Sequence, residues 1–301
     1  MVSIFLATYN GEKYLDQQLS SLFGQTYKDF IVYALDDCST DNTFSILECW
    51  RSKYPNKLFV SRRVENSGKP QIPFLELAIE RKATEYFMFC DQDDVWLPDK
   101  IQISVEAIRD YEKCYSSSTP ILLGTELLIT DQNLIPYKKQ KKRIDYEKYS
   151  KPNKLICYNI FTGCTIIFNA ALSNYIDKIP DNSILHDWWL AFVAASLGVT
   201  GVIPHPTMYY RQHGNNAVGA EINRSFKYYI DRLRKIWNND YYYLARLYLK
   251  HYSTYTSKQN LKMISTYSSL SNSSFIKKMI AFKKYQFWAP GTLRKIYQVL
   301  R

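Results

Sequence analysis

Short apolar runs alternate with segments of helical spacing over the first hundred residues, and this alternation constrains the fold more than any other feature of the sequence. Four runs of five to seven residues have the length and composition of strands: residues 2–8, 30–35, 57–62 and 86–90. Segments with helical spacing lie between and after them: residues 15–22, 44–50, 74–82 and 101–108. Strands alternating with helices predict an α/β fold, with a mostly parallel sheet covered by helices on both faces.

Polar side chains stand where three of these strands end. Thr8, Tyr9 and Asn10 follow the first run, Asp36 and Asp37 follow the second, and an acidic cluster at 91–94 follows the fourth. In open parallel sheets, ligands bind beyond the carboxyl ends of the strands. The sequence therefore predicts one crevice that collects these side chains.

The acidic cluster indicates a metal site. If Asp91 and Asp93 lie on an extended segment, their carboxylates project to one side while Gln92 faces the other way. Two such carboxylates suit one hard divalent cation, Mg²⁺ or Mn²⁺, which would neutralise a diphosphate leaving group. A solvated acidic pair in a loop is the alternative, but the position after an apolar strand favours the metal site.

Charge is distributed unevenly along the chain. Residues 1–221 carry 23 Lys/Arg and 26 Asp/Glu, whereas residues 222–301 carry 16 Lys/Arg and only 2 Asp/Glu. We place a boundary near residue 220, with a catalytic domain at 1–220 and a basic helical extension at 221–301. Apolar and basic residues interleave at 226–237 and 275–288, which is typical of an amphipathic helix on an anionic membrane surface. The alternative is that these helices pack on the catalytic domain or in a homodimer.

Other compositional features narrow the class of protein. The six cysteines are scattered without a C-x-x-C pair, which predicts reduced thiols rather than a zinc site or disulfides. The chain starts at once with a strand-like run, and no apolar run approaches the ~20 residues of a membrane span. We expect a cytoplasmic protein, peripheral at the inner face of the plasma membrane. Nucleic-acid binding through the basic extension is disfavoured by the acidic crevice.

Five segments together resemble family 2 glycosyltransferases with the GT-A fold: ATYNGEKYL at 7–15, DDCSTDNT at 36–43, CDQDDVWLPDK at 90–100, HDWW at 186–189 and YRQHGNN at 210–216. Their forms are most similar to the bacterial rhamnosyltransferase-like members. The resemblance implies a GT-A-like (Rossmann-like) domain, with a nucleotide-sugar half at 1–100 and an acceptor half at 101–220.

The resemblance also implies site residues. Donor binding falls to Thr8, Tyr9, Asn10, Glu12, Asp37, Asn66, Gly68, Asp91 and Gln92. Asp93 and His213 would hold the metal, and Asp37 would accept the imide hydrogen bond of the base. Asp187 would be the general base that takes the acceptor's proton. The acceptor and sugar pocket would contain Gly163, Cys164, His186, Trp188 and Trp189.

Some of these residues also have a purely structural interpretation. Asp187 suits a helix N-cap, and Trp188 and Trp189 suit a core. His213 suits a structural contact within its loop; the alternative is that Arg211 or His213 contacts phosphate or metal. A nucleotidyltransferase would share the fold and the metal. It would require a Gly-rich, basic phosphate loop after the first strand, where this chain has Thr8 to Glu12.

The predicted reaction is sugar transfer with inversion from a nucleoside-diphosphate donor to a saccharide acceptor, which we expect to be lipid-linked. The D-Q-D-D-V-W and H-D-W-W forms favour dTDP-L-rhamnose, and a UDP-hexose is the alternative donor. The product would belong to a capsular or other cell-surface polysaccharide.

Overall fold

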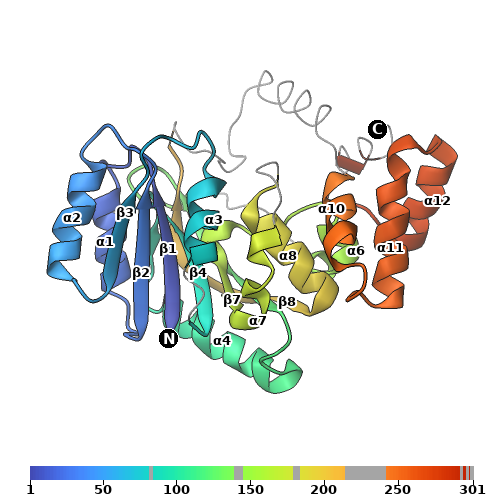
Figure 1. Cartoon of the computed structure of the whole chain (residues 1–301), viewed down its shortest axis with the longest axis horizontal. Helices are drawn as coiled ribbons and strands as arrows, with labels where there is room; N and C mark the ends of the chain where they lie inside the picture. Colours follow the sequence, from blue (N-terminus) through green and yellow to red (C-terminus); the bar gives the residue numbers. More distant parts are fainter. Residues whose placement is uncertain are drawn as a thin grey trace.

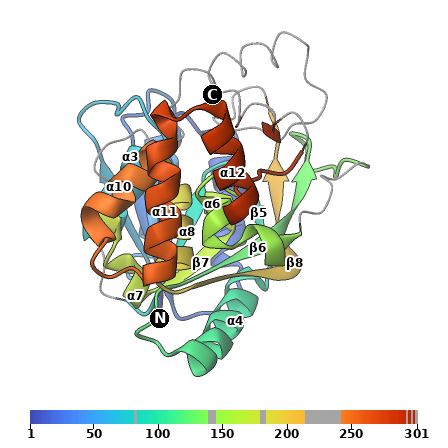
Figure 2. The same cartoon turned by 90° about the vertical axis from the view of Figure 1, so that its right-hand side faces the viewer.

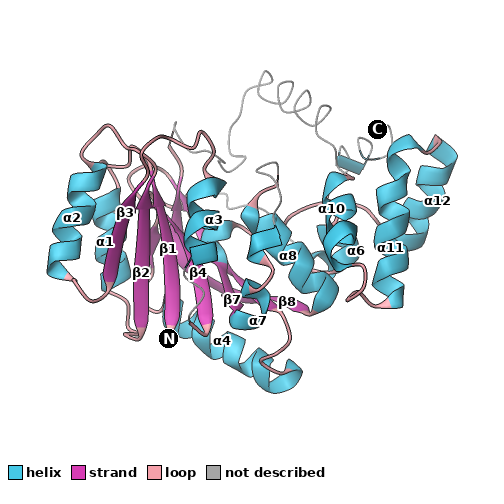
Figure 3. Cartoon of the chain, in the orientation of Figure 1, coloured by secondary structure: helices cyan, strands magenta, loops and turns pink. Residues whose placement is uncertain are grey.

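The computed structural model describes residues 1–80, 84–138, 145–178, 184–213, 242–291, 294, 295 and 298. Eight strands form one sheet in the order β3-β2-β1-β4-β7-β6-β8-β5. Their bounds are β1 Val2–Thr8, β2 Phe30–Asp36, β3 Leu58–Arg62, β4 Tyr86–Asp91, β5 Val95–Trp96, β6 Ile121–Thr130, β7 Ile166–Asn169 and β8 Val199–Arg211. Strands β1 to β4 pair with one another in parallel. Strand β7 lies between β4 and β6 and is antiparallel to both. The predicted α/β, GT-A-like fold is confirmed (Figure 3).

Helices cover both faces of the parallel part because side chains along each strand alternate in direction. Ile4 and Leu6 of β1 join a core beneath α1 Leu15–Phe23, α2 Thr43–Lys53 and α4 Lys100–Tyr115. Phe5, between them, belongs to the opposite core, beneath α3 Gln71–Glu80 and α8 His186–Leu197. The strand at 2–8 has the predicted bounds, while α3 begins three residues before the predicted helix.

The second half of the sheet carries short helical segments that shape one side of the crevice. These are α5 Tyr146–Tyr149, α6 Pro152–Leu155, η1 Gly163–Thr165, α7 Ala170–Ser173 and η2 Ile176–Lys178. Strand β8 runs parallel to β6 and then pairs antiparallel with β5, so its end at Arg211 returns to the acidic loop.

The C-terminal helices pack against the catalytic part of the chain. They are α10 Tyr243–Tyr252, α11 Lys258–Ser268, η3 Ser269–Asn272 and α12 Phe275–Tyr285 (Figures 1 and 2). Tyr248 of α10 meets Phe192 of α8 at 5.1 Å between ring centroids, and both belong to one continuous core. The sequence left open that these helices pack on the catalytic domain. Their buried faces do so. No helix within the described residues is long and apolar enough to span a membrane.

Two predictions concern residues that the structure does not describe. The proposed boundary near residue 220 and the amphipathic segment at 226–237 lie outside the described residues.

Candidate active site

The crevice predicted beyond the strand ends is present. Strand register sets Thr8 beside Asp36 and Ala7 beside Asp91, so the ends of β1, β2 and β4 meet at one edge of the sheet. Because the three strands are parallel and in this register, the polar residues that follow them lie together.

Hydrogen bonds within the protein fix the loop after β1. The Gln92 side chain accepts from the Tyr9 N–H at 2.9 Å and donates to the Tyr9 carbonyl at 2.8 Å. Gly11 leaves room for this side chain, since a Cβ there would lie 2.2 Å from the Gln92 Oε1 atom. Gln92 thus holds the loop, while the Tyr9 side chain stays 46% exposed at the crevice. The donor-binding role of Tyr9 stays a prediction.

Asn10 and Glu12 tie this loop to the start of α2. Asn10, at a φ of 46°, accepts from the Thr40 N–H through its side-chain oxygen at 2.9 Å. The Glu12 carboxylate accepts from the backbone and side-chain N–H groups of Asn42, both at 2.9 Å. Both residues therefore set the shape of the predicted nucleotide pocket, whatever direct contacts they make to a donor.

Asp36 and Asp37 have different surroundings. Asp36 is fully buried and accepts from the Thr8 hydroxyl at 3.1 Å and from the Ser39 N–H at 3.0 Å. Thr8, 2% exposed, thus supports Asp36 with its hydroxyl, and its role in donor binding stays a prediction. The ranking of Asp37 above Asp36 as a base-binding residue stays a prediction.

The Asp37 carboxylate bonds to several residues of the loop after β3. It accepts from the Ser67 N–H at 2.9 Å and from the Asn66 side chain at 3.2 Å, and it pairs with the Arg63 Nε at 3.0 Å. Gly68 follows at a φ of 69°, a backbone conformation that favours glycine. The structure brings Asp37, Asn66 and Gly68 together, as their common assignment to the donor requires.

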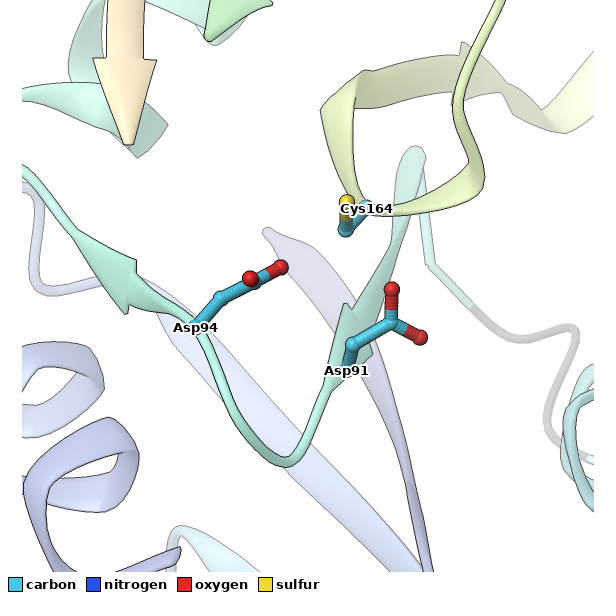
Figure 4. Close-up of side chains that lie close together, drawn as sticks. All are labelled: Asp91, Asp94 and Cys164. Carbon is cyan, nitrogen blue, oxygen red and sulfur yellow. The ribbon is translucent and has the colours of Figure 1, made fainter. Parts of the chain in front are cut away.

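The acidic loop differs from the predicted geometry. Strand β4 ends at Asp91, and residues 92 and 93 form a turn, so Asp91 and Asp93 do not share an extended segment. The turn instead brings the Asp94 carboxylate toward Asp91, and the Cys164 thiol from η1 completes the group (Figure 4). The ligand atoms of these three residues lie within 4.8 Å of one another.

This cluster concentrates negative charge away from water. Burial raises the pKa of Asp91 to about 7, and repulsion from Asp93 adds to the effect. Burial and the same neighbour raise the pKa of Asp94 well above its ordinary value. The Asp94 Oδ2 atom is buried without a hydrogen-bond partner among the described residues. Buried carboxylates that repel one another suit a divalent cation, which would compensate the charge and fill the vacant acceptor.

Asp93 and His213, the predicted metal ligands, bond to each other. The His213 Nε2 lies 2.8 Å from the Asp93 Oδ2, and the His213 ring lies tilted against the Tyr14 ring at 4.8 Å between centroids. Neither residue belongs to the group of three above, although Asp93 is close enough to raise the pKa values of Asp91 and Asp94. Their role as ligands stays a prediction.

Arg211 makes several hydrogen bonds within the protein, and the phosphate or metal contact considered for it stays a prediction. Its side chain donates to the Asp93 carbonyl at 2.7 Å, to the Gln132 carbonyl at 2.6 Å and to the Gln17 side chain at 2.6 Å. Its backbone N–H donates to Asp94 at 3.1 Å. Because the residue is only 3% exposed, its guanidinium clamps the acidic loop from the end of β8.

Asp187 lies in the first turn of α8. Its Oδ1 accepts from the Trp188 N–H at 2.6 Å, while Leu185 occupies the N-cap, so Asp187 is not merely the cap of this helix. Burial raises the pKa of Asp187 to about 6, although hydrogen bonds from Trp188, Gly163 and Asn159 act in the opposite direction. Asp187 contributes to the raised pKa of Asp91, after burial and the repulsion from Asp93. A Cβ on Gly163, the residue before Cys164, would lie 3.8 Å from the Asp187 Cβ.

His186 precedes this residue and is unsuited to be the base. It is 7% exposed, and its ring lies 4.9 Å from that of Phe74 and 4.4 Å from that of Phe89. Burial lowers the pKa of His186 to about 3, which keeps the imidazole neutral. Gly163 faces it closely, because a Cβ there would lie 3.0 Å from the His186 Nε2. Because Gly163 has no side chain, the His186 ring can lie close to its backbone. The contacts of Gly163 and His186 with a sugar stay predictions.

The two tryptophans separate into different environments. Trp189 is fully buried and donates its indole N–H to the Tyr175 carbonyl at 3.2 Å, which favours its interpretation as a core residue, while its assignment to the sugar pocket stays a prediction. Trp188 is partly exposed and donates to the Leu155 carbonyl at 2.6 Å. Cys164, at 1% exposed, lies beside the Asp91 and Asp94 side chains, and its role in a sugar pocket stays a prediction (Figure 4). Adjacent residues on a helix face different ways, so of the two tryptophans only Trp188 keeps part of its surface exposed.

Lys100, a lysine to which the sequence patterns assign no role, also lies near the acidic cluster. Lys100 is fully buried, donates to the Thr207 hydroxyl at 3.2 Å and lies 4.8 Å over the Trp96 ring. Burial lowers its pKa to about 8, whereas nearby Cys164 and Asp94 act to raise it. Its position at the end of the acidic motif was the available signal, and its partners come from β8, a hundred residues away.

The chain resembles known proteins over most of its length. Residues 3–172 match the family Glycosyl transferase family 2. The dTDP-rhamnosyl transferase RfbG of Shigella flexneri is 32% identical over 227 residues, which are 74% of this chain and 76% of that protein.

Two solved structures have a similar fold. Staphylococcus aureus TarS 1–349 in complex with UDP-GlcNAc has a TM-score of 0.58 at 19% identity, covering 99% of this chain and 89% of that one. The mannosyltransferase PcManGT of Pyrobaculum calidifontis, in complex with GDP-Man and Mn²⁺, has a TM-score of 0.53 at 17% identity, covering 99% and 86%.

Proposed function

The chain belongs to glycosyl transferase family 2 and is a nucleotide-sugar-dependent glycosyltransferase, and on that premise we propose that it transfers L-rhamnose, with inversion, from dTDP-L-rhamnose to a saccharide acceptor. The acceptor is lipid-linked, and the product is part of a cell-surface or capsular polysaccharide. A UDP-hexose is the alternative donor.

One observation carries the proposal: η1 stands between the candidate base and the acidic cluster, because Gly163 faces Asp187 while the ligand atoms of Cys164, the next residue, and of Asp91 and Asp94 lie within 4.8 Å of one another. Inverting transfer by single displacement requires a base on the acceptor side and charge stabilisation on the leaving-group side. Asp187 supplies the first, and the loop that contains Asp91 and Asp94 supplies the second.

In the proposed mechanism, Asp187 accepts the proton of the acceptor hydroxyl as that oxygen attacks the anomeric carbon. The N–H groups of Trp188 and Gly163 hold the carboxylate in place, and its raised pKa of about 6 leaves it ionised at neutral pH. A base with a pKa near the working pH combines a high ionised fraction with useful basicity. Inversion follows because no covalent intermediate forms on the protein.

The residues around Asp91 fit a divalent cation, Mg²⁺ or Mn²⁺. Asp91 and Asp94 would hold it, with Asp93 and His213 beside them as the further ligands that the family pattern suggests. When bound, the cation supplies positive charge to the departing diphosphate. Arg211 positions this loop through the Asp93 carbonyl, and Lys100 adds a buried positive charge behind Asp94.

The choice of rhamnose rests on the similarity to the Shigella flexneri transferase and on the forms of the motifs around Asp91 and Asp187. Thymine and uracil present the same imide to Asp37, so that contact does not select between dTDP and UDP donors. Selection depends on the remainder of the pocket, including the exposed Tyr9 ring.

A donor screen tests the proposal. Purified full-length protein with Mg²⁺ or Mn²⁺ is titrated with dTDP and UDP by calorimetry, and slow hydrolysis of dTDP-L-rhamnose and of UDP-hexoses is followed. We expect tighter binding of dTDP and faster hydrolysis of the rhamnose donor. A clear preference for UDP and its sugars would replace rhamnose with the alternative donor, and hydrolysis of neither class would refute the proposed reaction.

A further inference from the structure

Helix α12 exposes an apolar face. Phe275, Ile276, Met279 and Ile280 are 56%, 70%, 37% and 62% exposed. Spacings of one, four and five residues set them on one side of an α-helix. An adjacent face of the helix is already occupied, since Ala281 and Phe282 are buried within the core shared with α11. The exposed apolar side chains therefore form a second face beyond the one that folding requires.

Lysines accompany this face. Lys277, Lys283 and Lys284 are exposed on the same helix, and no Asp or Glu follows Asp240 in the sequence. A helix face exposed only to water would be polar throughout, whereas exposed apolar side chains among uncompensated lysines are typical of helices at a lipid–water interface. The positive charge also selects for an anionic surface.

We propose that α12 docks on an anionic lipid bilayer, with its exposed apolar residues at the headgroup–acyl boundary and its lysines on lipid phosphates. The helix has 11 residues and is ~16 Å long, against a hydrocarbon core of ~30 Å, so it lies on the membrane and does not cross it. Figure 1 places α12 at the opposite end of the molecule from α1 and α2, and Figure 2 shows it on the outer side of the C-terminal helices.

Hydrogen bonds connect the docking helix to the candidate active site. The carbonyls of Tyr285 and Gln286, at the end of α12, accept from the side chains of Asn153 and Lys154 of α6. At the end of α6, the Leu155 carbonyl accepts from the Trp188 indole at 2.6 Å. Docking thus fixes the position of the first turn of α8 relative to the bilayer. This consequence rests on the proposed function, because it gives a lipid-linked acceptor a defined approach to Asp187.

Vesicle binding tests the docking surface on the full chain without any sugar substrate. Sedimentation is measured with vesicles of phosphatidylglycerol and phosphatidylcholine and with vesicles of phosphatidylcholine alone. We expect binding to the anionic vesicles at low salt, weak binding to the neutral ones, and release from the anionic vesicles at high salt. Lys283→Gln with Lys284→Gln should weaken binding about 25-fold, because each lysine near such a surface contributes about fivefold (~1 kcal/mol).

Apolar variants and a matched control separate docking from general surface effects. Ile276→Ser with Ile280→Ser should weaken vesicle binding at least tenfold, because these side chains lose their apolar burial in the interface. The control, Val64→Ser with Ile79→Ser, changes two exposed apolar side chains at 97% and 47% exposure elsewhere on the molecule and should bind as the wild type does.

Several results would overturn the proposal. These are equal binding to neutral and anionic vesicles, binding to neither, unchanged binding of the α12 variants, or a dimer in sedimentation velocity that Ile280→Ser dissociates. The last result would assign the face to a second copy of the chain. Donor hydrolysis is measured separately in the absence of vesicles, so a failure of the proposed transferase reaction remains distinguishable from a failure of docking.

Discussion

Replacing Asp187 with asparagine removes the proposed base and leaves its shape. Loss of a general base lowers kcat by roughly 10²- to 10⁴-fold. Donor affinity should stay near that of the wild type, because the base acts on the acceptor in the transition state. The fold should survive: the pKa of Asp187 is raised to about 6 by burial, so ionisation above pH 6 opposes folding, and the neutral amide removes that cost.

The same raised pKa predicts a pH profile. With a pKa of about 6, half of the Asp187 side chains are ionised at pH 6 and roughly a tenth at pH 5. Wild-type kcat, measured at saturating donor and metal, should therefore fall about tenfold from its plateau to pH 5. The residual activity of Asp187→Asn should lack this dependence on pH.

The assay is release of the nucleoside diphosphate with an acceptor present, alongside calorimetric donor binding and thermal unfolding. Asp110→Asn is the matched control, because Asp110 is a 70% exposed carboxylate on α4 whose contact is a surface ion pair with Lys113. The reasoning would be refuted if Asp187→Asn kept more than a tenth of wild-type kcat. Collapse of donor affinity with kcat intact at saturation would likewise make Asp187 a binding residue.

Two further predictions concern the acidic loop. An excess of chelator should inactivate the enzyme reversibly, and Asp93→Asn or Asp94→Asn should abolish transfer with little loss of thermal stability; full activity in chelator would exclude the metal assignment. Arg211→Gln should destabilise the fold by about 1 to 3 kcal/mol, because it removes the three side-chain hydrogen bonds that hold the acidic loop to the end of β8. Denaturant unfolding measures that change, and a loss below 1 kcal/mol would contradict the clamp.

The sequence alone determined the architecture and the location of the site. A short, nearly continuous apolar run at residues 2–8 is typical of a strand that is buried on both faces, and β1 has those bounds and is buried along almost its whole length. The fall from apolar to acidic residues at 91–94 marked the end of a central strand, and the HDWW segment marked the start of α8. These features depend on neighbours within a few residues, so a single sequence contains them.

Only the tertiary structure decided which side chains meet. The Asp91 and Asp94 carboxylates gather around the Cys164 thiol because a turn follows β4 and η1 returns beside it. Arg211 reaches the same loop because β8 ends there, and Trp189 lies in the core while its neighbour Trp188 is partly exposed. The contacts of Cys164 and Arg211 with the acidic loop depend on packing between segments about 70 to 120 residues apart. The spacing of apolar residues within one segment does not predict such contacts, because they depend on how the sheet, η1 and α8 pack against one another.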